Sequence, residues 1–99
     1  MILHTVNRSP FQHDTLRACL RVAAAEDAIL LIEDGVYGAI EESELARLLG
    51  DAPAPRVYAL LADVEARGLT SLIQSSIALV DYRGFVDLTA QHDRVVSWF

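Results

Sequence analysis

The sequence contains no lysine, a single cysteine and no long apolar run, and each absence removes a class of function. Without lysine the chain cannot form a lysine Schiff base or contain a phosphate-binding P-loop. Its eight basic residues are therefore arginines, scattered through a chain of formal net charge −6, which argues against direct nucleic-acid binding. Cys19 has no second cysteine with which to form an internal disulfide. Because no segment approaches the roughly 20 apolar residues of a membrane span, we expect a cytoplasmic protein.

Metal and nucleotide motifs are absent from the sequence as well. The histidines His4, His13 and His92 lack the spacing of metal ligands. Gly35 and Gly38 are close together, but they do not form the G-x-G-x-x-G pattern of a dinucleotide-binding loop. We therefore expect neither a metal ion nor a cofactor.

Apolar residues are abundant, since 53% of the 99 residues are hydrophobic. A domain of this size buries only about 60–70% of the surface that its unfolded chain exposes. Two explanations are open: a partner covers an apolar patch, or the core is simply rich in alanine and leucine. We favour a subunit with a covered patch.

Short apolar runs that end in acids or glycine indicate strands buried on both faces. The clearest are residues 28–32, followed by Glu33-Asp34-Gly35, and residues 77–80, followed by Asp81. Further strands are predicted at residues 2–6, 56–61 and 94–99. Because the intervening segments are too long for hairpins, we predict a single α/β/α domain over residues 1–99 with a five-stranded, mainly parallel sheet.

The first helix is predicted to begin at Pro10, because Ser9 can cap a helix and proline suits its first turn. It should end near Ala25, with Leu16, Cys19, Leu20 and Ala23 on one face. The other helices are predicted at residues 36–40, 42–49, 63–67 and 82–91, and residues 69–76 are predicted to form a loop. In the last helix, Tyr82, Phe85, Val86 and Thr89 share one face.

Binding sites in open parallel sheets lie beyond the carboxyl ends of the strands. That edge should collect Arg8 and Ser9 together with the acids Glu33, Asp34, Asp63 and Asp81. The simplest interpretation is that these acids begin the helices that follow them. The alternative is a cleft lined by carboxylates. Either arrangement would repel phosphate, so nucleotide binding is disfavoured.

Cys19 is the one strong nucleophile in the sequence, and a persulfide-carrying cysteine must be ionised and reachable. It lies about nine residues into the predicted helix, beyond the useful range of the helix dipole. None of the residues three or four positions away along the helix, Thr15, Leu16, Val22 and Ala23, is basic. We therefore interpret Cys19 as a packed core residue, with sulfur carriage as the alternative.

The chain ends in Val95-Val96-Ser97-Trp98-Phe99. Trp98 and Phe99 could anchor a partner protein. They could equally hold the last strand against a helix, and the sequence leaves both interpretations open.

Four stretches, in order along nearly the whole chain, carry a family resemblance. They are Leu3-His4-Thr5-Val6-Asn7-Arg8-Ser9-Pro10-Phe11, Leu31-Ile32-Glu33-Asp34-Gly35-Val36, Val57-Tyr58-Ala59-Leu60 with Asp63 and Ala66-Arg67-Gly68, and Val80-Asp81-Tyr82 with Phe85-Val86-Asp87-Leu88-Thr89. With Trp98 near the end, this combination resembles the TusB/DsrH family of DsrE/F/H-like sulfur-relay proteins.

The resemblance implies a DsrEFH-type fold and assembly with TusC/DsrF-type and TusD/DsrE-type subunits into a heterohexamer. It implies that the complex passes persulfide sulfur through a TusE/DsrC-type acceptor toward 2-thiolation of the tRNA wobble uridine. In the Dsr branch, similar complexes serve sulfur oxidation. An acidic subunit of such a complex need not contact tRNA.

The resemblance also places the best-supported sulfur-accepting cysteine of these complexes on the TusD/DsrE-type subunit. Cys19 makes this chain similar to DsrH-like members that carry a cysteine in the first helix. The chain is therefore either a non-catalytic assembly subunit, which we favour, or a sulfur carrier through Cys19. A third hypothesis is an unrelated domain that binds a small ligand.

Overall fold

Five parallel strands form one sheet in the order β4-β3-β2-β1-β5. The structure is a computed structural model that describes residues 1–41 and 55–99. The strands are β1 (Ile2–Val6), β2 (Ala28–Leu31), β3 (Arg56–Leu60), β4 (Ala78–Val80) and β5 (Arg94–Trp98). The predicted α/β fold with a parallel sheet is confirmed.

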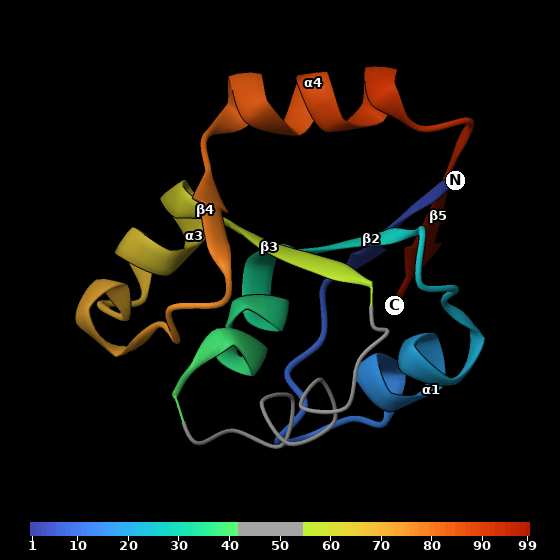
Figure 1. Ribbon diagram of the computed structural model, residues 1–99. Coiled ribbons are helices and arrows are strands. Elements are labelled where there is room, and N and C mark those ends of the chain that lie inside the picture. Colours follow the sequence, from blue (N-terminus) through green and yellow to red (C-terminus); the bar gives the residue numbers. More distant parts are fainter. Residues whose placement is uncertain (42–54) are drawn as a thin grey trace.

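Helices lie on both faces of the sheet (Figure 1). One face packs against α1 (Thr15–Val22), the 3-10 helix η1 (Glu33–Ala39) and α3 (Leu61–Ala66), and the other packs against α4 (Tyr82–Gln91). A further 3-10 helix, η2 (Thr70–Leu72), follows α3. Figure 1 shows α4 above the sheet, with α1 and η1 below it.

The two faces of the sheet bury different amounts of apolar side chain. The face under α1, η1 and α3 carries a broad core, which includes Cys19, Ile29, Leu31 and Val64. The face under α4 carries a smaller cluster of Leu3, Ala28, Leu30 and Leu88. All four residues of β2 are buried, as expected for a central strand covered on both sides.

The first helix begins later than its sequence predicts, at Thr15 rather than Pro10, and it ends at Val22 rather than Ala25. The carbonyl oxygen of Ser9 accepts hydrogen bonds from the backbone N–H groups of Gln12 and His13, at 3.2 and 3.0 Å. The Ser9 hydroxyl accepts another from the N–H of Phe11 at 3.2 Å. Ser9 therefore closes a separate turn instead of capping the helix.

The remaining boundaries agree with prediction to within two residues where the structure describes them, except that η1 begins three residues early. The helix at Tyr82–Gln91 was predicted at the same residues, and η1 extends the predicted turn at residues 36–40 toward its amino end. The segment predicted as a loop after Gly68 contains η2 and an isolated antiparallel bridge between Ile40 and Ile73. The predicted helix at residues 42–49 lies outside the described residues.

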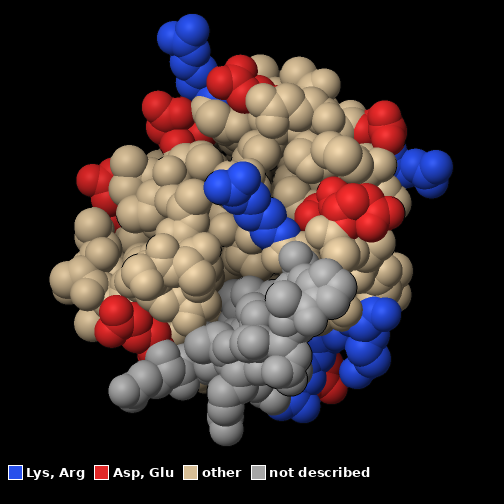
Figure 2. All heavy atoms as spheres, in the orientation of Figure 1, with Lys and Arg blue, Asp and Glu red and all other residues tan. Residues whose placement is uncertain are grey.

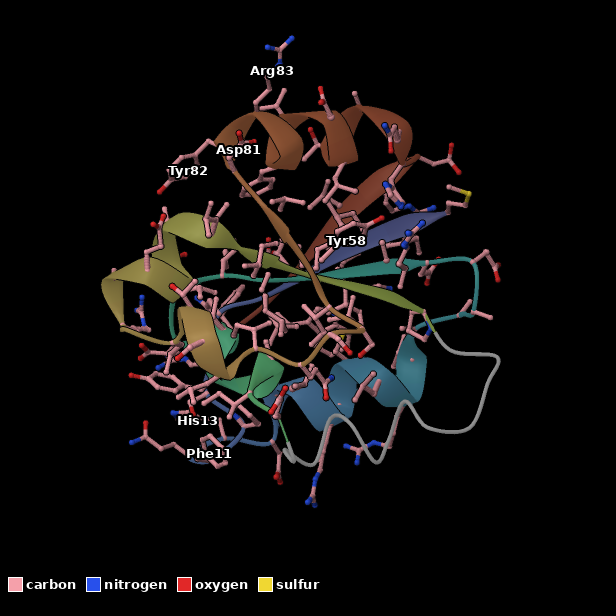
Figure 3. The ribbon with its side chains drawn as sticks, turned by 60° about the vertical axis from the view of Figure 1, so that its left-hand side comes forward. Phe11, His13, Tyr58, Asp81, Tyr82 and Arg83 are labelled. Atoms are coloured by element: carbon pink, nitrogen blue, oxygen red, sulfur yellow. The ribbon has the colours of Figure 1, made fainter. Side chains whose placement is uncertain are left out.

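The apolar residues of α4 are divided between two environments. Leu88 is buried and Phe85 is half-buried against the sheet, whereas Tyr82 and Val86 are each 64% exposed. Figure 3 shows Tyr82 and Arg83 pointing away from the sheet at the start of this helix. The face that Tyr82 shares with Val86 therefore remains uncovered in the isolated chain.

Candidate functional site

The carboxyl ends of β1 and β2 meet in a tightly built turn. The carbonyl oxygen of Val6 accepts a hydrogen bond from the N–H of Ile32 at 3.0 Å. Gly35 packs so closely against the end of β1 that a Cβ atom there would overlap the Val6 carbonyl oxygen. Glu33, between them, has a φ of 49°, in the left-handed region that costs a non-glycine residue free energy.

Two of the predicted edge acids, Asp34 and Asp63, contact one arginine, and the third, Glu33, is joined to them through its backbone N–H. Nε and Nη2 of Arg67 both donate to Oδ1 of Asp34, at 3.1 and 2.9 Å, and Nη1 donates to the carbonyl oxygen of Asp63 at 3.2 Å. Oδ2 of Asp63 accepts a hydrogen bond from the N–H of Glu33 at 2.7 Å. Asp34 and Asp63 therefore fasten η1 to α3, and their carboxylates are partnered rather than forming an open cluster.

Asp81, the fourth predicted acid, has a separate structural role. It is the N-cap of α4, and its Oδ1 accepts a hydrogen bond from the N–H of Gly84 at 2.8 Å. The interpretation of this acid as the start of a helix is therefore confirmed. Arg8, predicted at the same edge, is exposed.

A cavity of about 310 Å³ lies beyond the carboxyl ends of β1 and β2. Its described lining consists of Ser9, Phe11, Gln12, Asp34 and Tyr37. Ser9 and Asp34 were both predicted at this edge, and the structure brings them to one cavity. The volume is at the lower end of the range for small-molecule sites.

Three lining residues, Phe11, Gln12 and Tyr37, were missed by the sequence analysis. The pattern had placed Phe11 and Gln12 in the first turn of a helix and gave no reason to single them out as lining residues. The only available signal was Ser9, since a serine can close a short turn as readily as it caps a helix. Nothing in the sequence marked Tyr37.

Cys19 lies in the main core, on the face of α1 that packs against the sheet. It is the fifth residue of α1, about 6 Å along the axis from the first residue, and therefore nearer the amino end than predicted. Its exposed fraction is 0%. Burial, assisted by the negative charge of Asp27, raises the pKa of the Cys19 thiol to about 12. The thiol is protonated and unreachable in this conformation.

Near Cys19, a buried hydrogen-bonded chain joins Trp98, His4 and Asp27. The indole Nε1 of Trp98 donates to Nδ1 of His4 at 3.0 Å, and Nε2 of His4 lies 3.0 Å from Oδ2 of Asp27. Because an indole N–H can only donate, Nδ1 accepts and the His4 proton lies on Nε2, directed at Asp27. Both ring nitrogens are occupied, so His4 cannot accept the proton of Cys19.

Asp27 is the hub of this network. Its carboxylate also accepts hydrogen bonds from the backbone N–H groups of Ile2 and Ala24, at 2.9 and 3.0 Å. Burial raises the pKa of Asp27, but the hydrogen bonds from His4, Ala24 and Ile2 outweigh it and lower the pKa to about 2. The carboxylate fixes the loop before β2 against the start of β1.

The two terminal aromatic residues have different surroundings. Trp98 is half-buried and packs against the main core, as expected if it holds the last strand in place. Phe99 is 81% exposed and remains available to a partner. On the side of the molecule shown in Figure 2, acidic and basic groups are interspersed among broad uncharged areas.

Neither a metal centre nor a membrane helix is found in the part of the chain that the structure describes. Within residues 1–41 and 55–99, no three His, Cys, Asp or Glu side chains are grouped so that they could hold a metal ion. No helix in these same ranges combines the length and apolar character needed to span a bilayer.

Comparison with solved structures gives the same fold. The E. coli YchN protein matches with a TM-score of 0.83 and 17% identity, over 97% of each chain. Protein Tm0979 from Thermotoga maritima, solved by NMR, matches with a TM-score of 0.69 and 34% identity, over 94% of this chain and 95% of that one.

Comparison of sequences identifies the family. Residues 8–95 match the family described as DsrH like protein. Proteins named TusB from Yersinia pestis (strain Pestoides F) and Yersinia pseudotuberculosis (serotype O:1b, strain IP 31758) are 45% identical over 97 residues, which cover 98% of this chain and 100% of theirs. The chain therefore belongs to the TusB/DsrH family.

Proposed function

We propose that this chain is an assembly subunit of a TusBCD-type sulfur-relay complex, and that it does not itself carry sulfur. The observation that carries this proposal is the burial of Cys19, since a sulfur carrier needs a reachable thiolate. The chain also matches proteins named TusB, over 98% of its own length and 100% of theirs.

Uncovered apolar surface supports an assembly role. Tyr82 and Val86 on α4 are each 64% exposed, Val95 on β5 is 44% exposed and Phe99 is 81% exposed. Large apolar side chains of this kind, and aromatic ones above all, are favoured at the centres of protein interfaces. The partners that we propose are TusC/DsrF-type and TusD/DsrE-type subunits, in a cytoplasmic heterohexamer.

The proposed pathway is transfer of persulfide sulfur through a TusE/DsrC-type acceptor toward 2-thiolation of the tRNA wobble uridine. The net charge of −6 and the interspersed surface charges fit a subunit that does not bind tRNA directly. Cells that lack this chain should therefore lose 2-thiouridine from their tRNA, measured by mass spectrometry of the nucleosides. Unchanged 2-thiouridine would favour the sulfur-oxidation branch.

Reconstitution tests the role of Cys19. The purified complex is supplied with labelled sulfur by a cysteine desulfurase, and transfer to the acceptor is compared for the wild type, Cys19→Ser and Cys19→Ala. Unchanged transfer in both variants is expected for an assembly subunit. Loss of transfer in both variants, with the complex intact by size-exclusion chromatography, would instead make Cys19 the carrier.

A further inference from the structure

We propose that the cavity beyond β1 and β2 binds a basic side chain, a guanidinium or ammonium group, presented by a partner protein. The cavity is the one lined by Ser9, Phe11, Gln12, Asp34 and Tyr37. That the ligand comes from a protein rests on the function proposed above, whereas the preference for a cationic group rests on the cavity itself.

The chemistry of the lining selects a donor of hydrogen bonds. Four of the five described lining side chains, those of Ser9, Gln12, Asp34 and Tyr37, carry an oxygen that can accept a hydrogen bond. None of the five is basic. Phe11 adds an aromatic ring, whose face attracts cations. An anionic group such as a phosphate would find only the hydroxyl and amide hydrogens here, beside a carboxylate.

Among the described residues, only one oxygen of the Asp34 carboxylate accepts a hydrogen bond. Nε and Nη2 of Arg67 both donate to Oδ1 of Asp34. The ion pair is therefore not the two-oxygen, bidentate kind in which each nitrogen bonds a different carboxylate oxygen. No hydrogen bond within the described residues engages Oδ2, and the side chain of Asp34 remains 59% exposed. Arg67 also limits the charge available to a ligand, because its guanidinium partly neutralises Asp34.

Hydrogen bonds within the chain form the rim of the cavity in the absence of a ligand. Ser9 is only 7% exposed, and its hydroxyl and carbonyl oxygens accept the hydrogen bonds that close the turn over residues 9–13. This turn holds the Phe11 side chain outward, 67% exposed. Figure 3 shows Phe11 and His13 together at the outer edge of the molecule. Because the hydrogen-bonded turn keeps the apolar ring of Phe11 exposed to solvent, the ring is suited to contact a partner protein.

The volume of the cavity and the net charge of the chain restrict the class of ligand further. A volume of about 310 Å³ suits one long side chain better than a nucleotide with its phosphates. The net charge of −6 attracts cations to the whole molecule.

Titration of the full chain by NMR tests the proposal. The probe is Nα-acetyl-arginine amide, and the matched control is Nα-acetyl-citrulline amide, which has nearly the same shape but no charge. We expect the arginine probe to shift the amide signals of residues 9–13 and 34–37, with at least threefold weaker binding of citrulline, in the range of an exposed ion pair. Equal binding of both probes, or no shift at these residues, would overturn the proposal.

Two variants should change the affinity in opposite directions. Asp34→Asn should weaken binding of the arginine probe at least threefold, and Arg67→Gln should strengthen it, because Asp34 then loses its competing partner. Asp87→Asn, on the exposed surface of α4, changes the net charge equally and should have no effect. An unchanged affinity in both cavity variants would count against the proposal, and the wild-type probe comparison stands even if one of them does not fold.

A titration with a polyamine distinguishes a protein ligand from a small metabolite. Spermidine, which carries more positive charge, should bind the acidic chain without preference for the cavity. Selective shifts at residues 9–13 and 34–37, at lower concentrations than the arginine probe needs, would contradict a protein ligand. Failure of this proposal is distinguishable from failure of the proposed function. Probe binding in a chain that forms no relay complex would refute the relay role alone, whereas an intact complex without probe binding would refute the cavity's role alone.

Discussion

The indole N–H of Trp98 donates a 3.0 Å hydrogen bond to Nδ1 of His4, and so joins the last strand to the first, its neighbour in the sheet. Through Nε2 of His4 the connection continues to Asp27, in the loop that precedes β2. Asp27 and Trp98 lie 23 and 94 positions from His4 along the chain, and their bonds tie both ends of the described fold to its centre. A buried polar chain of this kind stabilises only while every member keeps its partner.

Trp98→Phe should lower the free energy of unfolding by about 1 kcal/mol, because Nδ1 of His4 loses its donor while the aromatic packing is largely kept. Urea denaturation followed by circular dichroism measures this loss. Phe99→Leu is the control, since that side chain is 81% exposed and a surface substitution should change stability by no more than about 0.5 kcal/mol. Equal effects of the two substitutions would show that the bond to His4 contributes nothing.

The pKa of Asp27 predicts a loss of stability in acid. Because the folded-state pKa is lowered from 3.8 to about 2, the contribution of Asp27 is present above pH 4 and is lost as the pH falls through 2. Roughly 2 kcal/mol should disappear over that interval. The measurement is urea unfolding at a series of pH values, with Asp27→Asn beside the wild type. The variant should be less stable at pH 7, and its stability should depend less steeply on pH below 4.

The raised pKa of Cys19 predicts a loss of stability at alkaline pH. Its pKa is raised from 9.0 to about 12, so the stabilisation that comes from keeping the thiol protonated is complete below pH 9 and declines as the pH rises toward 12. At pH 10 the decline should be roughly 1 kcal/mol, obtained from unfolding curves at pH 8 and pH 10. Cys19→Ala removes the thiol, and its curves should lack this part of the change. Identical pH dependence in both proteins would contradict the raised pKa.

Burial should also make Cys19 slow to react. At pH 7.5 the folded chain should react with iodoacetamide far more slowly than the urea-unfolded chain, because the thiol is reached only when α1 opens from the sheet. Mass spectrometry of the alkylated protein over time gives both rates. Similar rates in the two states would place Cys19 at the surface and favour its role as a sulfur carrier.

Removal of the Phe11 ring from the rim of the cavity should weaken ligand binding without unfolding the protein. Phe11→Ala should weaken binding of Nα-acetyl-arginine amide by about two- to fivefold, the effect of an exposed cation–π contact. The free energy of unfolding should stay within about 0.5 kcal/mol of the wild type, because the side chain is 67% exposed. A large loss of stability would mean that Phe11 supports the fold rather than a ligand.

The strands and α4 could be predicted because their signals are local. Runs such as Ile29-Leu30-Leu31 must be buried on both sides, and the carboxylate of Asp81 marks the start of a helix. The hydrophobic pattern also showed that Tyr82 and Val86 lie on one face of α4. It could not show that this face points away from the sheet, because that choice depends on Leu88 and Phe85 fitting β2 and β3.

The site depended on contacts that no local pattern encodes. The cavity exists because the turn at Ser9 meets η1 near Asp34, some 25 residues later. The turn itself was mistaken for a helix start, since the Ser9 hydroxyl can accept from the backbone in either structure. The partners of His4 are also distant in sequence, at 23 and 94 positions. Contacts between residues so far apart in the sequence can be predicted only once the order of the strands in the sheet is known.

The crowding of Gly35 against the Val6 carbonyl has a consequence for the history of this fold. No substitution at that position can be accommodated by moving a side chain, because the obstacle is backbone in the neighbouring strand. Divergent descendants that keep the β2–η1 connection should therefore keep a glycine here, whatever else has changed around it. The position offers a fixed point for aligning distant members of the lineage, and a bulkier residue there would signal that the connection has been rebuilt.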